Sequence, residues 1–225
     1  NKTSDSDLNY SATVKTNENG VAIFTDVPYG EYTITEIDEN GWVLKEEKIV
    51  TLDSEEIETE VENQLSKGTV KILKKMNEND TVDGLSFHII GRGQVVVKGT
   101  DGNYINTDLD VKIKIGKTDA QNEITVNEGQ LTNNNIKIEK LDNDSSALIT
   151  LTDVYVGRYE AEEVDIPLLE DGKTPKYIAN NDSATLALNG QTVTLNITNR
   201  WKTGTLKIVK TAEEGVELKG FKVRV

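Results

Sequence analysis

Six polar residues stand where the period of two in a β-strand would carry them onto an apolar face. In the stretch "GTVKILK", Lys74 shares a face with Val70 and Ile72, and Lys210 has the same position in "GTLKIVK". A polar side chain in line with apolar ones must find a partner in the core or destabilise the protein. The other residues placed in this way are two glutamates and two asparagines: Glu36, Glu163, Asn63 and Asn199.

Lysine, glutamate and asparagine have a joint chemistry that needs burial. Desolvation disfavours the ammonium and the carboxylate, so a buried lysine loses its proton and a buried carboxyl group stays neutral. The neutral amine can attack the asparagine carbonyl while the glutamate shuttles protons and ammonia leaves. The product is a Lys–Asn isopeptide bond between two strands. Because the fold holds the groups in contact, a core can perform this step once without an enzyme.

Internal repetition puts one residue of each type into each of two homologous units. The segments "VENQLSKGTVKILKK" (61–75) and "ITNRWKTGTLKIVKT" (197–211) have the same spacing from Asn to Gly to Lys. The segments "TDVPYGEYTITE" (25–36) and "TDVYVGRYEAEE" (152–163) both read T-D-V-x-x-G-x-Y-x-x-x-E. The chain therefore contains two related units.

The elements that must position these residues are β-strands. Short alternating runs rich in β-branched residues recur between turn signals such as "NENG", "DENG" and "EDGK". Stretch 55–64, "EEIETEVENQ", has a strand period and predicts a strand ending at Asn63. The pattern predicts an all-β protein built of sandwiches.

Composition excludes several function classes. The 225 residues carry a formal charge of -14, which repels nucleic acid and anionic membranes. Cysteine is absent and His88 is the one histidine, so no thiolate or imidazole cluster can form and no cofactor is expected. No stretch resembles a signal peptide or a membrane span. We therefore expect either a cytosolic protein or an internal piece of a longer secreted chain, and the start "NKTSDSDLNY" favours the piece.

The chain resembles the Cna B-type domains, also called SpaA-like or prealbumin-like domains, of Gram-positive surface adhesins and pilins. The matching elements are a first strand G-x-V/L-x-I-x-K, the stretch "TNENGVAIFTDVPYGEYTITEIDENGW", and a terminal strand that ends in Asn. The resemblance implies immunoglobulin-like sandwiches of the seven-strand type, a stalk architecture, and an isopeptide bond from a first-strand Lys to a last-strand Asn with Glu assisting.

Carried over residue by residue, the resemblance implies two isopeptide triads. One consists of Lys74, Glu163 and Asn199, and the other of Lys210, Glu36 and Asn63. In each, the lysine and asparagine are joined and the glutamate is the proton shuttle. The alternative is an ordinary salt bridge at the rim of a sandwich, with Asn63 capping a turn.

The order of the triads predicts the domain organisation. Residues 67–200 carry one triad in family order and form a complete domain with an insertion across about 91–147. Residues 1–64 lack a first strand, whereas residues 203–225 consist of first strands and then stop. We therefore expect one complete large domain and one domain split between the chain ends, the C-terminal end complementing residues 1–64 of the next copy.

Two explanations fit the split domain: a period cut from a tandem array, or a protomer that donates strands to its neighbour. Both predict identical copies arranged head to tail through short links such as "QLSKG", with strand 205–211 beside strand 57–63 of the next copy. The predicted function is a structural stalk or fibre of a bacterial cell-surface protein, extracellular and either cell-wall-attached or filamentous. This segment has no predicted membrane insertion and no nucleic-acid partner.

Other interpretations have less support in the sequence. The alternative function is a ligand-binding adhesin module that uses the 91–147 insertion. A true enzyme is not expected, because no nucleophile and base pair occurs outside the triads. Asp101, Asn103 and Asp108 could ligate calcium, but a hairpin turn explains them better, so no metal site is predicted.

Overall fold

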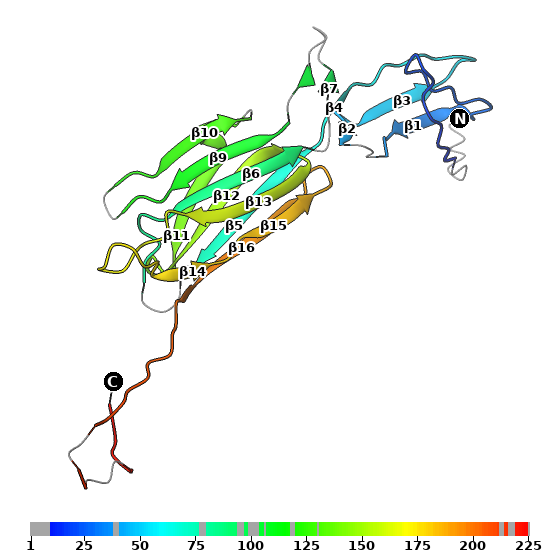
Figure 1. Cartoon of the computed structure of the whole chain (residues 1–225). Coiled ribbons are helices and arrows are strands. Elements are labelled where there is room, and N and C mark those ends of the chain that lie inside the picture. The colour runs from blue at the N-terminus through cyan, green and yellow to red at the C-terminus, as the bar shows by residue number, and fades with distance from the viewer. Residues whose placement is uncertain are drawn as a thin grey trace.

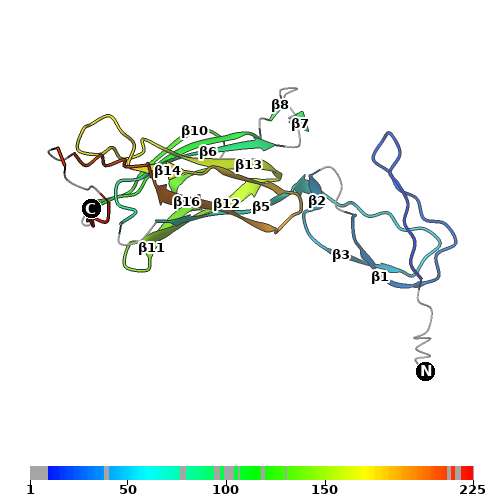
Figure 2. The same ribbon diagram turned by 60° about the horizontal axis from the view of Figure 1, so that its bottom comes forward.

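The molecule is elongated, with a central sandwich between two smaller parts. The computed structural model describes residues 10–37, 41–76, 80–93, 107–117, 120–129, 131–211, 214–215 and 219–224, and the backbone of 97–98 and 104–105. Figures 1 and 2 show an N-terminal unit (residues 10–65) at one end of the sandwich. A C-terminal segment (residues 202–224) leaves from the opposite end (Figure 1).

The central sandwich consists of two five-stranded sheets. The first has the order β10-β9-β6-β13-β15 and the second the order β11-β12-β5-β16-β14. All neighbours are antiparallel except β5 and β16, which run parallel. The bounds are β5 (Lys67–Lys75), β6 (Ser86–Gly93), β9 (Leu109–Lys114), β10 (Glu123–Glu128), β11 (Ile136–Leu141), β12 (Ser146–Tyr155), β13 (Gly157–Val164), β14 (Tyr177–Ala179), β15 (Asp182–Leu186) and β16 (Thr192–Trp201).

The all-β prediction is confirmed. In the described part of the chain the one helical turn is the 3₁₀ element η1 (Asn133–Asn135). A short hairpin, β7 (Val97–Lys98) with β8 (Tyr104–Ile105), stands apart from both sheets. Within the predicted insertion, β9 and β10 extend one sheet and β11 extends the other. The two sheets contain seven strands besides these three. No helix in the described residues is long and apolar enough to cross a membrane.

The core lies between the sheets and follows the period of two. Along β5, Val70, Ile72 and Lys74 are buried while the residues between them are partly exposed. β13 and β16 alternate in the same way, and the rest of the core is aliphatic with Phe87 and Tyr159. Burial of each large apolar side chain contributes about 1.5–3 kcal/mol. The same packing carries the polar residues at the strand ends into the core.

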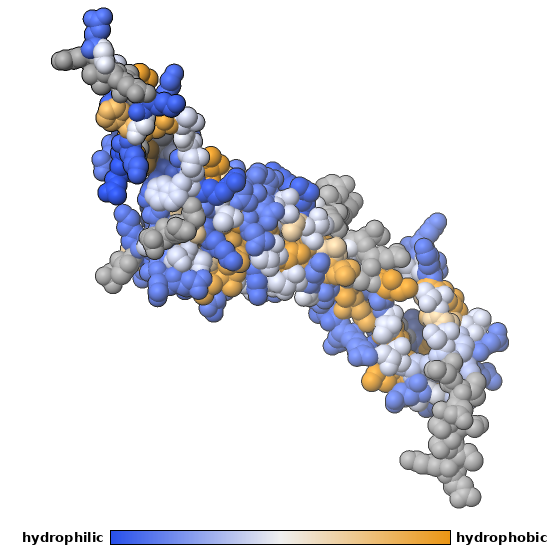
Figure 3. Space-filling view, turned by 90° about the horizontal axis from the view of Figure 1, so that it is seen from below, coloured by the Kyte–Doolittle hydropathy of each residue, from blue (hydrophilic) through white to orange (hydrophobic). Residues whose placement is uncertain are grey.

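The N-terminal unit contains two short strand pairs and little core. β1 (Gly30–Ile34) pairs with β3 (Lys48–Leu52), and β2 (Trp42–Leu44) pairs with β4 (Asn63–Leu65). Many of its apolar side chains are exposed, and Figure 3 shows hydrophobic surface at this end of the molecule. These side chains are Val14, Val21, Ile23, Phe24, Tyr29, Ile37, Ile49, Ile57 and Val61.

Two predicted strands are largely unpaired in the described part of the chain. Of the strand expected over 57–63, only Asn63 lies in a ladder, and residues 205–211 lie in none. The physical reason is that a strand needs a neighbour to satisfy its backbone N–H and C=O groups. In the central sandwich that neighbour is supplied by the parallel pairing of β5 and β16.

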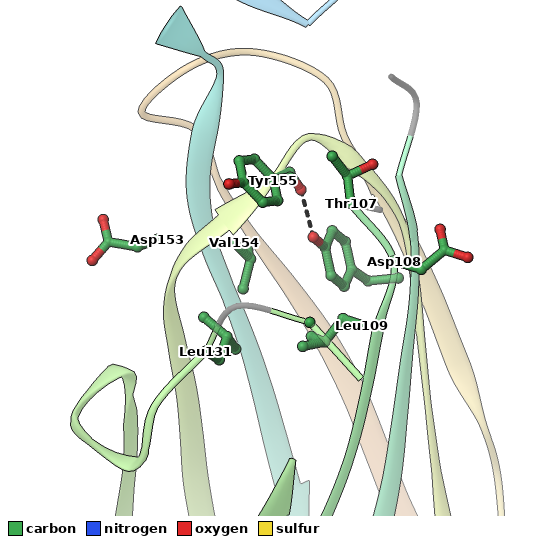
Figure 4. Close-up of a pocket in the computed structure, with 9 residues that line it drawn as sticks. Thr107, Asp108, Leu109, Leu131, Asp153, Val154 and Tyr155 are labelled. Carbon is green, nitrogen blue, oxygen red and sulfur yellow. Dashed lines mark hydrogen bonds between the residues drawn. The ribbon is translucent and has the colours of Figure 1, made fainter. Parts of the chain in front are cut away.

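The repeated T-D-V-x-x-G-x-Y motif has the same conformation in both copies. Asp26 and Asp153 both have left-handed backbone, with φ of 57° and 58°. The Tyr32 hydroxyl donates to the carbonyl of Pro28 at 2.5 Å, and the Tyr159 hydroxyl donates to that of Tyr155, the bond dashed in Figure 4. A tyrosine that ties its strand back to the preceding chain is a corner device of β-sandwiches. The two motifs are therefore structural as well as sequence repeats.

Strand pairing is repeated in the same register. Gly30 faces Leu52 in β1–β3, as Gly157 faces Leu186 in β13–β15. Likewise Asn63 faces Leu44 in β2–β4, as Asn199 faces Ala179 in β14–β16. The N-terminal unit thus repeats the later strands of the sandwich.

Candidate functional site

A cluster of three polar side chains lies at one end of the sandwich core. Lys74 is on β5 and Asn199 is on the adjacent parallel strand β16, where Ile197 is the register partner of Lys74. Asn199 follows Ile197 by two residues and so points to the same side. Glu163 comes from β13 in the facing sheet. As whole residues, including the backbone, Lys74 is 0% exposed, Glu163 8% and Asn199 1%.

The distances place the carboxyl group of Glu163 between the two nitrogen atoms. Its Oε2 is 2.6 Å from Lys74 Nζ, and its Oε1 accepts a hydrogen bond from Asn199 Nδ2 at 3.1 Å. Lys74 Nζ also donates to Asn199 Oδ1 at 2.5 Å. The amine, the carboxamide and the carboxyl group are therefore in mutual contact.

Burial changes the acidity of the amine. The pKa of Lys74 is lowered from its ordinary value, chiefly because the interior does not solvate the ammonium, while the hydrogen bond and charge of Glu163 oppose the shift. The neutral amine therefore forms more readily here than it would on the surface. The interpretation as a salt bridge at an exposed rim does not fit this site, since the side chains of Lys74 and Glu163 are both 0% exposed.

Of the second predicted triad, the structure brings two members together. Asn63 Nδ2 donates to Glu36 Oε1 at 2.8 Å, and both side chains are exposed. Lys210 is on the C-terminal segment at the other end of the molecule, with Nζ 2.8 Å from the ring centroid of Phe221. Within one chain Lys210 does not meet Asn63.

The weaker metal candidates are occupied by protein groups where the structure describes them. Asp101 and Asn103 lie outside the described residues. Asp108 accepts from Arg92 at 2.8 Å and from the backbone of Gly93 at 2.9 Å. His88 is a strand residue of β6 beside Asp110, at 3.1 Å. No group of three or more potential ligands was found in the described part of the chain.

Sequence reasoning missed one neighbour of the buried cluster. Asn199 Nδ2 also lies 3.7 Å from the sulfur atom of Met76. Met76 follows Lys74 by two residues, so the strand period that placed Lys74 could have placed the thioether beside it. A soft apolar group there adds to the desolvation of the cluster.

The cavity shown in Figure 4 is lined by residues of the insertion and of the tyrosine corner. Thr107, Leu109, Leu131, Val154 and Tyr159 surround about 10 Å³. That space is no larger than a water molecule requires. It gives no room for a small-molecule ligand.

Comparison with known proteins gives a family match for the N-terminal part of the chain. Residues 2–65 match the family described as SpaA, prealbumin-like fold domain. No curated protein matches the sequence.

Solved structures with detectable similarity include the major pilin from Streptococcus pyogenes, at 14% identity and TM-score 0.33, covering 76% of this chain and 70% of that one. The Bacillus anthracis TIE protein aligns at 17% identity and TM-score 0.27, covering 85% of this chain and 46% of that one. The shaft pilin from Lactobacillus rhamnosus GG aligns at 13% identity and TM-score 0.25, covering 86% of this chain and 74% of that one. The predicted resemblance to SpaA-like, prealbumin-like domains is confirmed by this family match, which covers residues 2–65.

Proposed function

We propose that this chain is a structural module of a bacterial cell-surface stalk or fibre, locked by autocatalytic isopeptide bonds. The observation that carries the proposal is the buried contact of Lys74, Glu163 and Asn199. In a SpaA-type protein such a contact serves the fibre by joining two adjacent strands covalently. The only catalysis proposed is this single turnover within the fold.

The reaction at the buried cluster balances without any co-reactant. The neutral Lys74 amine attacks Cγ of Asn199, and the new C–N bond forms as the C–Nδ2 bond breaks. Glu163 accepts the proton from Nζ through Oε2 and returns a proton to Nδ2 from its carboxyl group, so that ammonia leaves. The two carboxyl oxygens already face the two nitrogens, which favours this transfer.

The proposal of a fibre rests on a strand that the N-terminal unit lacks in its described residues, the equivalent of β5. By the repeated register, residues 20–25 correspond to β12 and residues 57–63 to β16, the two strands that flank β5. Among the described residues 10–37 and 41–65, none pairs with both of these segments as β5 pairs with β12 and β16. The C-terminal segment has the corresponding sequence, "GTLKIVK", without a partner. We therefore propose that residues 205–211 of one copy complete the N-terminal unit of the next.

The turn after this strand supports the assignment. Gly84 and Gly220, each ten residues after the respective lysine, both have positive φ, 78° and 88°. Leu85 and Phe87 follow Gly84 and are buried, whereas the corresponding Phe221 and Val223 are 55% and 60% exposed. The C-terminal segment thus presents unburied counterparts of core residues.

The energetics explain why a covalent bond is useful at this joint. Burying four side chains, Leu206, Ile208, Phe221 and Val223, would contribute about 6–12 kcal/mol. The loss of rotational and translational freedom on association costs about 4–15 kcal/mol. Docking alone is therefore reversible, and a bond from Lys210 to Asn63 of the next copy, assisted by its Glu36, would make it permanent.

Separate subunits and tandem repeats of one polypeptide both satisfy this arrangement, and both predict an extracellular, cell-surface location. The alternative function, an adhesin module using the 91–147 insertion, receives no support from the 10 Å³ cavity beside that insertion. The fibre is therefore the function that we propose.

Intact mass spectrometry tests the buried bond. Well-folded protein should weigh one ammonia less than its sequence for the Lys74–Asn199 bond, and Glu163→Ala should restore the full mass. Glu160→Ala is the matched control, because Glu160 lies on the same strand with its side chain exposed on the other face. A full, unmodified mass in folded wild-type protein would show that the bond does not form.

Denaturing electrophoresis tests the fibre. Concentrated wild-type chain should form a ladder of covalent multimers in boiling detergent, and Lys210→Ala or Asn63→Ala should abolish it. Lys207→Ala, an exposed lysine of the same segment, should leave the ladder intact. Absence of multimers by both denaturing electrophoresis and sedimentation would contradict association of separate chains.

A further inference from the structure

The link between the N-terminal unit and the central sandwich is one residue long. Ser66 alone separates β4 from β5, and it is 1% exposed. Its N–H donates to Gly41 in the N-terminal unit at 2.7 Å, and its carbonyl accepts from Val156 in the sandwich at 3.1 Å. Because a single buried residue is hydrogen-bonded to both units, this joint is stiff. The five-residue link expected from "QLSKG" is shorter in the structure, since its other residues belong to strands.

A glycine directly after the joint is required by close packing. A Cβ on Gly68 would lie 2.4 Å from the carbonyl oxygen of Gln191 and 2.9 Å from Cδ1 of Leu186. Next to it, Thr69 N–H donates to the same carbonyl at 2.9 Å. The start of β5 thus packs against the loop that follows β15, and only glycine leaves room for that loop.

The C-terminal segment repeats the first half of this joint. Trp201 faces Tyr177 at the end of β16, as Leu65 faces Trp42 at the end of β4. The next residue, Lys202, donates its N–H to the carbonyl of Lys176 at 3.4 Å. That bond corresponds to the one from Ser66 to Gly41. The exit from the sandwich is therefore set up in the same way as the exit from the N-terminal unit.

Gly204 is the counterpart of Gly68, but no contact in the described part of its own chain explains it. A Cβ there would have no atom within 4 Å, and its φ does not lie in the left-handed region. Neither packing nor backbone conformation in the free chain requires a glycine at this position. The correspondence with Gly68, which is closely packed, instead points to a contact outside the free chain.

We propose that Gly204 is a contact residue for the next copy, where it determines whether the joint can close. This inference rests on the proposed head-to-tail assembly and adds its geometry. By the repeated register, Leu52 of the next copy takes the place of Leu186, and the loop after β3 takes the place of the loop after β15. The backbone of that loop then packs directly on Gly204.

The repeat also indicates which residue of the next copy would receive the C-terminal segment. Tyr29 precedes Gly30 as Val156 precedes Gly157, so the Tyr29 N–H of the next copy donates to the carbonyl of Lys202. Val156 is 2% exposed in the closed joint, whereas Tyr29 is 65% exposed in the free chain. Successive copies are then joined as stiffly as the two units within one chain, which suits a fibre that transmits force.

Gly204→Val tests the inference in the Lys210→Ala chain, where association is reversible. The dissociation constant from sedimentation should rise by roughly tenfold or more, because the added side chain meets backbone in a closed joint. The melting temperature of the single chain should not change, since the position faces open space. Thr203→Val introduces the same side chain one residue earlier and should leave association unchanged. Gly68→Val should instead lower the melting temperature of the single chain.

A second measurement uses the chain with Lys210 in place: Gly204→Val should slow the covalent ladder by a similar factor. If Gly204→Val associates and cross-links as well as the parent, the inference about the joint is wrong and the head-to-tail assembly stands. A lower melting temperature for the single Gly204→Val chain would also overturn it, because the glycine would then serve its own chain. Failure of the parent chain to associate in any form would instead overturn the proposed assembly.

Discussion

Preventing the Lys74–Asn199 bond should remove a large part of the stability of the central sandwich. The two residues are 125 positions apart, so the bond closes nearly the whole sandwich into one loop. By analogy with disulfide cross-links, closing a loop of this size restricts the unfolded chain by about 5 kcal/mol at 25 °C. For a domain of this size, that loss lowers the melting temperature on the order of 15 °C.

The perturbation must separate the covalent bond from the buried polar contacts. Glu163→Gln keeps the size of the side chain but removes the proton shuttle, so the bond should not form. Lys74→Met combined with Glu163→Gln removes the amine as well and leaves no buried charge. If the bond is the main source of stability, both proteins should lose a similar free energy of unfolding relative to wild type.

The assay is chemical denaturation followed by intrinsic fluorescence, with the mass of each protein measured beforehand. Limited proteolysis of the same samples should show cleavage in both variants under conditions where wild type resists. The reasoning would be refuted if the two variants matched wild type in stability and protease resistance. It would also be refuted if a wild-type protein of full, unreacted mass showed the same advantage over the variants.

Three further outcomes follow from the same contacts. In the unlinked Glu163→Gln protein, the free energy of unfolding should rise with pH up to about the ordinary lysine pKa of 10.5. The reason is that burial lowers the pKa of Lys74, so the folded protein gives up a proton that the unfolded chain still holds. The Lys74→Met/Glu163→Gln protein, titrated in the same way, is the control and should lack this slope. Tyr159→Phe should cost about 1–3 kcal/mol in denaturant unfolding, because the Tyr155 carbonyl loses its buried donor. Glu36→Ala should suppress the covalent ladder yet leave non-covalent association measurable by sedimentation, and loss of both would assign Glu36 to docking instead.

The sequence was sufficient to predict the all-β class and the strand faces on which the residues of the buried site lie. A period of two along "GTVKILK" fixes which residues share a face, whatever the rest of the chain does. Lys74 is buried with Val70 and Ile72 because the three side chains leave the strand on the same side. The repeated motifs likewise predicted two related units, since the same local residues give the same corner at Tyr32 and Tyr159.

The sequence could not predict which strands would find partners. Stretch 57–63 has as clear a strand pattern as β16, yet most of it lies in no ladder. Pattern describes the faces of a strand, but its hydrogen bonds depend on a neighbour that is distant in the sequence or on another chain. The three strands that the insertion adds to the sheets were hidden for the same reason.

Tertiary structure alone decided the relation between the groups. It placed the Glu163 carboxyl group from the facing sheet between two nitrogens on parallel strands, with separations of 2.6 and 3.1 Å. Spacing along a chain determines the face on which a side chain lies, whereas the packing of sheets and the course of the chain between them determine what that side chain meets.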